Sequence, residues 1–499
     1  MNADVLWASA PLVIVLGLML WRRWSSARAG ATGLAAAVLI AALRFGLTWD
    51  VLWVSQARGV ALSFYILYII WAALLLYQVV RAAGGIGQLE SWLLGMVADQ
   101  PAAALLFSWC LSGVLEGIAG FGVPLAVVAP MLVALGIGPV TAVAAVAIGH
   151  AWSVTFGDMG VVFEALVSVV GVPRQDLVPA AAASLGVACV ASGWAVSRLV
   201  GLRGRAVQVG LIGLAMAGTQ GVLALVGLAP LAALGGGAAG LVVGVVLLGR
   251  GKRAREVRSA EVAIRLSPYL VATAVLALPA FSPSVATALA HPSTQVSLPA
   301  VSTSAGWVTA AGGTKAIPWL LHPATAMLAA LGIVVPFYIK ARHTTPPALG
   351  DAIRRTVRAA IPTSAGVAVM IALAMVMDHT GMVQVMAQAA SQALGAAFPA
   401  VSGLVGLLGA FTTGSNTSSN VLFGPLQESM ATLLGLAAPW LLAAQTAGGA
   451  VGSMVAPAKL VVGCSSVGVA GAEGEVMRRT APLALGVAVL VGLVALALA

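Results

Sequence analysis

Apolar residues run along the chain in long blocks that are separated by charged residues or by glycine and proline. Ten blocks stand out, and they cover 5–21, 31–45, 60–80, 178–198, 208–229, 231–249, 266–281, 317–339, 359–377 and 481–499. A helix needs about 20 apolar residues to cross the hydrocarbon core of a bilayer. The pattern therefore predicts an all-α polytopic membrane protein with about 12–14 transmembrane helices.

Composition narrows the class of protein further. Of the 499 residues, 61% are hydrophobic and only 8% are charged, whereas soluble domains carry about 25% charged residues. The mean hydropathy is +1.04. These values exclude a water-soluble globular protein, and the blocks leave no stretch long enough for a separate soluble domain.

The formal net charge of +10 indicates orientation rather than nucleic-acid binding. Most basic residues stand in short clusters between the apolar blocks, at 22–28, 81, 198–205, 250–265, 340–358 and 478–479. Cytoplasmic loops of membrane proteins are enriched in Lys and Arg. Placing these clusters in the cytoplasm puts both termini outside and requires an even number of crossings.

Two polar segments lie between apolar blocks. The basic run 250–265 either divides the chain into an N-terminal membrane half, 1–249, and a C-terminal one, 266–499, or is only a solvated cytoplasmic loop. The Ser/Thr/Pro-rich stretch 282–315 falls outside the cell by the charge rule. It is expected to be a loop or a partly re-entrant segment.

Regions 109–160 and 403–470 break the simple pattern. Both are apolar enough for the bilayer, yet both are rich in Gly, Pro, Ser, Thr and Asn and contain ionisable residues. In hydrocarbon every backbone N–H and C=O needs a partner, so non-helical backbone survives only where protein buries it or a wet cavity solvates it. We therefore expect broken helices in both regions, at the working part of the molecule.

The two regions resemble one another in layout. The first contains EGIAGFGVP and then TFGDMG, and the second contains TTGSNTSSN and then GSMVAPAK. Gly120 and Gly157 are 37 residues apart, and Gly414 and Gly452 are 38 apart. Paired, interrupted apolar segments in two halves of a chain are typical of the binding site of a secondary transporter.

In the second region, eight of the nine side chains from Thr412 to Asn420 are hydroxyl or amide groups. A helix broken there exposes N–H groups that suit a carboxylate, and carbonyls and hydroxyls that suit a small cation. The alternative is a polar seam that binds neighbouring helices. The candidate substrate-binding residues are Gly414, Ser415, Asn416, Thr417, Ser418, Ser419 and Asn420.

In the first region, Gly120, Phe121 and Gly122 are the matching candidates for substrate binding. Glycines there permit a tight turn and close approach to a ligand, although they also serve close helix packing. Glu116 stands beside them in apolar sequence. An intramembrane carboxyl is costly and by default functional, so Glu116 is a candidate proton carrier. Its alternative role is to cap the broken helix.

Three further ionisable residues fall in the broken regions. Asp158, between two glycines, is a second candidate proton carrier, and His150 a third, although a lone buried His is often only a hydrogen-bonded interior residue. Lys459 is expected to meet a substrate carboxylate or to neutralise Glu116 or Asp158, unless it reaches out to an interface. Glu164 fits an internal role or the outer interface, and Asp378 with His379 is interpreted as interfacial.

The sequence contains no recognisable motif for enzyme catalysis. The sequence contains no P-loop, HExxH or CxxC motif, and its three cysteines, Cys110, Cys189 and Cys464, lie far apart in apolar runs. Without a nucleophile–base pair or a cluster of metal ligands, we expect no enzyme, no cofactor and no metal site.

At the two broken regions the sequence resembles the L-lactate permease family. The matching segments are Leu115 to Gly136, Ala410 to Gln427 and Val451 to Gly468. The resemblance implies proton-coupled uptake of short 2-hydroxymonocarboxylates such as L-lactate and glycolate across the bacterial inner membrane. Many members of the family carry an aspartate where Asn416 stands, which leaves the exact substrate and coupling ion open.

The wider ion-transporter superfamily is similar in carrying Ser-Asn-Thr motifs on re-entrant hairpins, here Ser415-Asn416-Thr417. That likeness implies inverted repeats, a scaffold domain, a moving transport domain and possibly a homodimer. The resulting hypothesis is a proton-coupled carrier of a small organic anion. A sodium-coupled carrier of dicarboxylates or inorganic anions and a passive anion channel are the alternatives.

Overall fold

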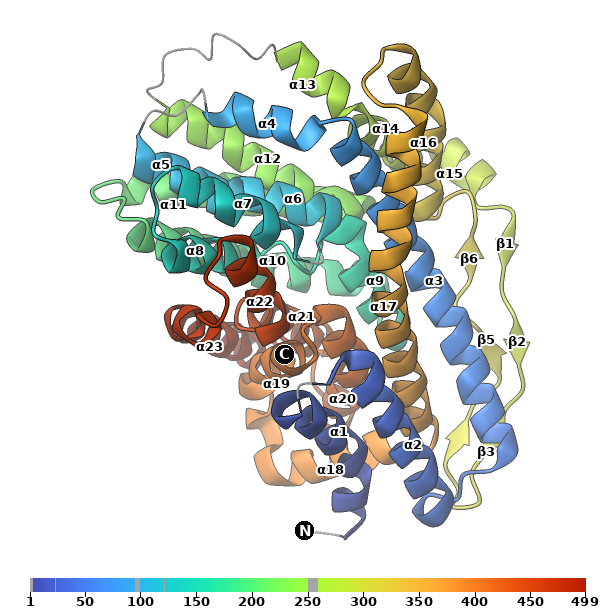
Figure 1. The fold of residues 1–499 in the computed structure, drawn as a ribbon. Helices are drawn as coiled ribbons and strands as arrows, with labels where there is room; N and C mark the ends of the chain where they lie inside the picture. Colours follow the sequence, from blue (N-terminus) through green and yellow to red (C-terminus); the bar gives the residue numbers. More distant parts are fainter. Residues whose placement is uncertain (1–2, 23, 95–98, 121, 250–258) are drawn as a thin grey trace.

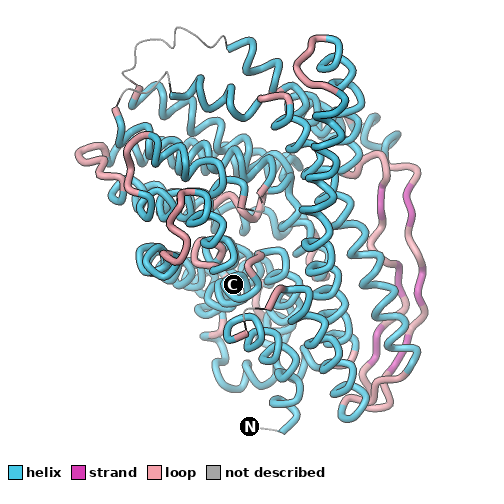
Figure 2. Tube along the Cα trace, viewed as in Figure 1, coloured by secondary structure: helices cyan, strands magenta, loops and turns pink. Residues whose placement is uncertain are grey.

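The computed structural model describes residues 3–22, 24–94, 99–120, 122–249 and 259–499, and helices make up most of it (Figures 1 and 2). Up to residue 249 the helices are α1 (Ala3–Trp21), α2 (Ser26–Arg44), α3 (Trp49–Ala82), α4 (Gly85–Leu94), α5 (Gln100–Leu105), the π-helix η1 (Leu106–Leu111), α6 (Ser112–Ala119), α7 (Val123–Ala134), α8 (Pro139–Ala151), the 3-10 turn η2 (Asp158–Gly160), α9 (Val161–Val169), α10 (Arg174–Leu199), α11 (Ala206–Leu223), the π-helix η3 (Ala224–Leu228) and α12 (Ala229–Leu248). From residue 259 they are α13 (Ser259–Arg265), α14 (Ser267–Phe281), α15 (Pro283–Leu289), α16 (Pro323–Lys340), α17 (Pro346–His379), α18 (Met382–Leu394), the 3-10 turn η4 (Gly395–Ala397), α19 (Pro399–Thr413), α20 (Asn416–Leu434), α21 (Ala438–Gly452), α22 (Pro457–Ser466) and α23 (Glu473–Leu498).

The prediction of an all-α polytopic membrane protein is confirmed. Within the described residues, nine helical stretches are long and apolar enough to cross a membrane, and one of them, Ala206–Leu248, combines α11, η3 and α12. Five shorter apolar helices accompany them, including α7, α8 and α19. The total of 12–14 crossings stays a prediction, because it depends on how the shorter helices lie in the bilayer.

Two helices extend well beyond their apolar runs. The run 60–80 belongs to α3, which already begins at Trp49, where Thr48 Oγ1 accepts the Val51 N–H at 3.3 Å. The run 359–377 belongs to α17, which begins at Pro346 after the cap Thr345. Capping side chains satisfy N–H groups that the first turn leaves free. The polar residues on these first turns lower the hydropathy without breaking the helix, so the runs underestimate both helices.

The segment 282–315 is neither a plain loop nor a re-entrant helix. After α15 it forms a long antiparallel hairpin of three short ladders, β1 (Ser293–Thr294) with β6 (Ile317–Pro318), β2 (Ser297–Leu298) with β5 (Gly312–Gly313) and β3 (Val301–Ser302) with β4 (Val308–Thr309). The hairpin runs beside α3 along one edge of the molecule (Figure 2). Its β-branched residues favour strands.

The long helices α3 and α17 pack along one another and form one side of the molecule (Figure 1). α2 packs on α17, and α16 packs on α3. The broken helices form a separate set of contacts, in which α19 and α20 pack on α21, and α6 packs on α12. The site described next lies where these two groups meet.

The predicted linker 250–265 is covered only in part. Residues 250–258 lie outside the described residues, and 259–265 forms α13. The division into the halves 1–249 and 266–499 therefore remains a prediction.

Candidate functional site

Both predicted regions contain broken helices. α6 ends at Ala119 and α7 begins at Val123, with Gly122 at φ +83°. α19 ends at Thr413 and α20 begins at Asn416, with Gly414 at φ +70° between them. Glycine reaches positive φ without the steric cost that a Cβ carries. The glycines at these two points are thus required by the turn itself.

A second break accompanies each of these. In the first region α8 ends at Ala151, and the chain then turns through Asp158 and Met159, at φ +50° and +55°, before α9 starts. In the second region α21 ends at Gly452 and α22 begins at Pro457. Two non-glycine residues in the left-handed region are unusual, and such backbone concentrates at functional sites.

A cavity of about 260 Å³ lies between the breaks. Predicted residues that line it are Glu116, Gly122, Asp158, Gly414, Ser415, Asn416, Thr417, Ser418 and Lys459. α2 contributes Ser26, and α17 contributes Thr363 and Val367. The cavity therefore joins both broken regions with the long helices.

Three charged residues converge on this cavity. The side chains of Glu116 and Asp158 are buried, with 1% and 6% exposed. Lys459 Nζ lies 3.9 Å from Glu116 Oε1, and Asp158 accepts a hydrogen bond from the Gly120 N–H. Of the roles left open for Lys459, the structure shows pairing with Glu116, and its position on the cavity wall favours an internal role over an interfacial one.

Hydroxyl groups shape the tip between α19 and α20. Ser415 N–H donates to Thr413 Oγ1 at 3.3 Å, and Ser415 Oγ accepts the Ser418 N–H at 3.4 Å. This is an N-cap, which satisfies a free N–H of the first helical turn. The first turn of α20, with Thr417 and Ser418, faces the cavity with its hydroxyl side chains.

An amide–hydroxyl network joins the two broken regions directly. Asn416 Nδ2 donates to Thr155 Oγ1 at 3.3 Å and to the Thr446 carbonyl at 3.0 Å. Asn420 Nδ2 donates to Thr446 Oγ1 at 2.9 Å and to the Val162 carbonyl at 3.3 Å. Residues more than 250 positions apart in sequence are thus held together. We call this set, Thr155, Asn416, Asn420 and Thr446, the joint.

Some predicted residues stand behind the cavity wall. Ser419 Oγ donates to the Gly406 carbonyl at 2.9 Å, so it binds α20 to α19. Asn420 belongs to the joint, and Gly120 supports Asp158. Phe121 lies outside the described residues.

His150 is buried in α8 and is not on the cavity wall. Its Nδ1 lies 2.7 Å from the Val146 carbonyl within the same helix. This is the arrangement of a hydrogen-bonded interior histidine, the simpler of its two predicted roles. Its part in proton transfer stays a prediction.

Sequence reasoning missed several residues of the site. Thr155 lies in the TFGDMG motif, where its residue type alone indicates no role, and Thr446 lies outside every motif. Thr446 follows Gln445 within the otherwise apolar stretch of α21, and such a polar pair was the available signal. Ser26 and Thr363 lie near a helix start and within a long helix, where a polar residue signals nothing, so sequence alone gave no indication of them.

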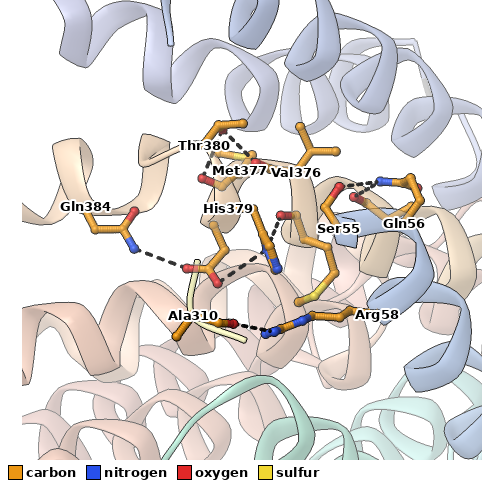
Figure 3. Close-up of polar contacts among 12 residues, drawn as sticks. Ser55, Gln56, Arg58, Ala310, Val376, Met377, His379, Thr380 and Gln384 are labelled. Atoms are coloured by element: carbon orange, nitrogen blue, oxygen red, sulfur yellow. Dashed lines mark hydrogen bonds and ion pairs between the residues drawn. The ribbon is translucent and has the colours of Figure 1, made fainter. Parts of the chain in front are cut away.

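Asp378 and His379 lie away from this cavity, at the end of α17. His379 is buried and Asp378 is about one-third exposed, at 37% of its side chain. Figure 3 shows Arg58 of α3 beside His379, with Arg58 Nη2 donating to the Ala310 carbonyl of the hairpin at 3.0 Å. Gln384 of α18 donates to Asp378 Oδ1 at 3.3 Å. This cluster fastens the hairpin and α18 to the long helices.

Comparison with known proteins agrees with this architecture. Residues 4–499 match the family model described as L-lactate permease. An L-lactate permease of Streptococcus iniae is 29% identical over 77% of this chain and 82% of its own length. The glycolate permease GlcA of Escherichia coli strain K12 is 26% identical, over 99% of this chain and 96% of its own length. An L-lactate permease of Bacillus subtilis strain 168 is also 26% identical, over 95% and 92%.

The relatives are permeases by name, and none of the three is named as an enzyme. The match extends through both broken regions and through the long helices that complete the cavity. The chain belongs to the L-lactate permease family.

Proposed function

We propose that this protein is a secondary active transporter that carries a small 2-hydroxymonocarboxylate, such as L-lactate or glycolate, together with a proton across the bacterial inner membrane. The observation that carries the proposal is the small cavity in which Lys459 and the start of α20 face Glu116 and Asp158. Family membership supports the substrate class.

The cavity offers each part of such a substrate a suitable partner. A helix N-terminus carries a partial positive charge, and the first turn of α20 lines the cavity together with Lys459. These groups suit the carboxylate, and the Thr417 and Ser418 hydroxyls suit the 2-hydroxyl. A cavity of about 260 Å³ is small for a ligand site, which favours a molecule of few atoms.

Charge balance supports proton coupling. With Lys459 charged and both Glu116 and Asp158 ionised, the site carries one net negative charge and repels an anion. Protonation of one carboxyl makes it neutral, so proton and anion enter together most easily. An anion moving inward alone is also opposed by about 2.3 kcal/mol per 100 mV of membrane potential, and a cotransported proton removes that opposition.

A sodium-coupled carrier is the second candidate, and one observation favours it. The side-chain oxygens of Asn416 and Asn420 are buried without a hydrogen-bond partner. Amide oxygens are suitable ligands for a small hard cation. Sodium would supply the same compensating charge as a proton. The sequence alternative pairs this ion with a different substrate, a dicarboxylate or an inorganic anion.

Uptake by the purified full-length protein in proteoliposomes tests these alternatives. We expect L-lactate to accumulate against its gradient when the outside is acidic, and a protonophore to abolish the accumulation. Replacing sodium by choline is expected to have no effect. Loss of uptake in choline would establish sodium coupling instead, and equilibration without accumulation would exclude ion coupling and leave passive transport, as in a channel.

The larger arrangement is also part of the proposal. Ser26 and Thr363 come from α2 and α17, whereas the remaining polar wall comes from the broken helices. We infer that α2, α3, α16 and α17 belong to a scaffold, and that the broken helices form a transport domain built from inverted repeats. We also propose that the protein forms a homodimer and that both of its termini lie outside the cell.

Substitution of Lys459 tests its contact with the substrate. Lys459→Gln is expected to raise the half-saturation concentration for L-lactate about tenfold to a hundredfold, because a charge-assisted hydrogen bond contributes about 1.5–3 kcal/mol. Lys459→Arg keeps the charge and is expected to lose less. Concentration-dependent initial uptake rates measure both.

The matched control is Lys340→Gln, which removes an exposed lysine at the end of α16. Because Lys459→Gln also leaves Glu116 unpaired, the double variant Glu116→Gln/Lys459→Gln is measured in lactate exchange. Wild-type half-saturation in the double variant would show that Lys459 only balances Glu116 and does not bind the substrate.

A further inference from the structure

A second polar cavity lies on the other side of α9. Val162, in the first turn of α9, lines the central cavity, and Glu164 lines the second one. The second cavity measures about 400 Å³. Residues of α12, α14 and α16, among them Leu231, Leu276 and Ala326, form an apolar wall. Four polar side chains, Tyr65, Glu164, Arg174 and His322, also line the cavity, and we call them its polar corner.

Arg174 brings positive charge to this corner. It forms an ion pair with buried Glu164, whose other oxygen accepts the Tyr65 hydroxyl at 3.3 Å. The Arg174 side chain is nevertheless 41% exposed. A guanidinium has five N–H donors, so pairing with Glu164 leaves donors that can serve a ligand in the cavity.

His322 adds a buried donor. Its Nδ1 accepts the Ala324 N–H at 3.3 Å. Burial lowers the pKa of His322 to about 4, an effect that the Tyr65 backbone carbonyl offsets in part. The ring is therefore neutral at pH 7, with its proton on Nε2. This buried N–H has no hydrogen-bond partner, because the Tyr65 carbonyl near it lies beyond hydrogen-bond distance. Tyr65 and Tyr68 hold the ring, with centroid distances of 4.6 and 4.9 Å.

A second cation stands over this corner. Lys315 Nζ, on the hairpin, lies 5.3 Å from the centre of the Tyr65 ring. Burial lowers the pKa of Lys315, and the nearby Glu164 carboxylate acts against that shift. Lys315 does not line the cavity itself, but when it is protonated two cations lie at or beside the corner against one carboxylate. The excess charge of the corner therefore favours an anion over a metal cation.

We propose that this cavity is a second binding site for a small monocarboxylate, whose carboxylate is held by Arg174 and by the Nε2–H of His322 while its carbon end contacts the apolar wall. The choice of L-lactate as the probe rests on the proposed function. The site itself does not, since it shares only the helix α9 with the central cavity.

Protection of an introduced cysteine tests this site. Leu320 lines the cavity and is 43% exposed, and the native cysteines are all buried. The Leu320→Cys protein in phosphatidylcholine nanodiscs is modified with a methanethiosulfonate that carries a sulfonate, with and without L-lactate. We expect saturating L-lactate to slow modification several-fold, and uncharged lactamide, of nearly the same size, to have no effect.

Variants locate the protecting site. In Leu320→Cys, the added pair Glu164→Gln/Arg174→Gln removes both charges together, so that neither stays buried without its partner, and protection is expected to disappear. His322→Asn keeps an acceptor for the Ala324 N–H and is expected to weaken protection. Arg203→Gln, in the exposed loop after α10, is the matched control and is expected to keep protection.

The results that would contradict binding in this second cavity differ from those that would contradict transport through the central cavity. Lys459→Gln, which alters the central cavity, is expected to leave protection unchanged, and loss of protection there would place the ligand in the central site. Equal protection by lactamide, or none by L-lactate, would overturn the proposal. Protection by phosphatidylglycerol nanodiscs without L-lactate would assign the corner to a lipid headgroup instead. If the double variant does not fold, unchanged protection in His322→Asn overturns the proposal.

Discussion

Replacing Glu116 by Gln or Asp158 by Asn is expected to abolish proton-driven accumulation of L-lactate while lactate exchange continues. Both carboxyls line the central cavity, where each can take up the proton that balances the entering anion. An amide cannot be protonated at physiological pH, so the coupled step is lost. Exchange of internal for external lactate needs no net proton movement and is expected to survive.

The two substitutions are expected to differ in one respect. In Asp158→Asn the new amide oxygen can still accept the Gly120 N–H, so the break keeps its shape. In Glu116→Gln the ammonium of Lys459 loses its carboxylate partner, and a free ammonium attracts the substrate more strongly. Glu116→Gln is therefore expected to lower the half-saturation concentration for exchange, whereas Asp158→Asn is expected to leave it near the wild-type value.

Measurement uses proteoliposomes with an imposed pH gradient and, separately, preloaded lactate. Asp351→Asn, which changes an exposed carboxylate near the start of α17, is the control and should accumulate lactate normally. If both site variants still accumulate lactate with the pH gradient, neither Glu116 nor Asp158 is the proton carrier.

Much of the architecture could be predicted because a bilayer restricts the chain so strongly. In hydrocarbon the backbone must pair within itself, so the apolar runs at 178–198 and 481–499 had to be helices, and the structure has α10 and α23 there. By the same rule, Gly, Pro and polar residues at membrane depth predicted the breaks next to Gly122 and Gly414.

The hairpin shows where this reasoning stops. The Ser/Thr/Pro-rich stretch 282–315 has too little periodicity for any element to be chosen from the sequence. The hairpin is held in place by contacts with α3, such as that of Arg58 with the Ala310 carbonyl. A local pattern contains no information about a partner that lies 252 residues away.

For the site, too, the sequence predicts some features and not others. The sequence predicts Glu116, Asp158, Lys459 and the Ser-Asn-Thr segment as site residues, because charged and polar side chains are costly in a membrane. The partners of these residues depend on three-dimensional packing. The pairing of Lys459 with Glu116, and the hydrogen bond from Asn416 to Thr155, became visible only in the structure.

Gly449→Ala is expected to lower L-lactate uptake strongly without unfolding the protein. Gly449 lies within α21, where alanine is the better helix former by about 1 kcal/mol. A Cβ there would collide with the side chain of Asn416. Asn416 must then move, and it loses its hydrogen bonds to Thr155 and Thr446. The substitution thus breaks the joint while favouring the helix.

The expected loss follows from these two bonds. At about 1 kcal/mol each, they correspond to roughly a tenfold to hundredfold drop in the initial uptake rate at low substrate concentration. Gly486→Ala is the matched control, since it lies within α23 and a Cβ there meets no atom within 4 Å. Initial uptake rates, normalised to the amount of folded protein in the membrane, compare the two. Wild-type uptake by Gly449→Ala would mean that the position of Asn416, and with it the joint between the two broken regions, is not needed for transport.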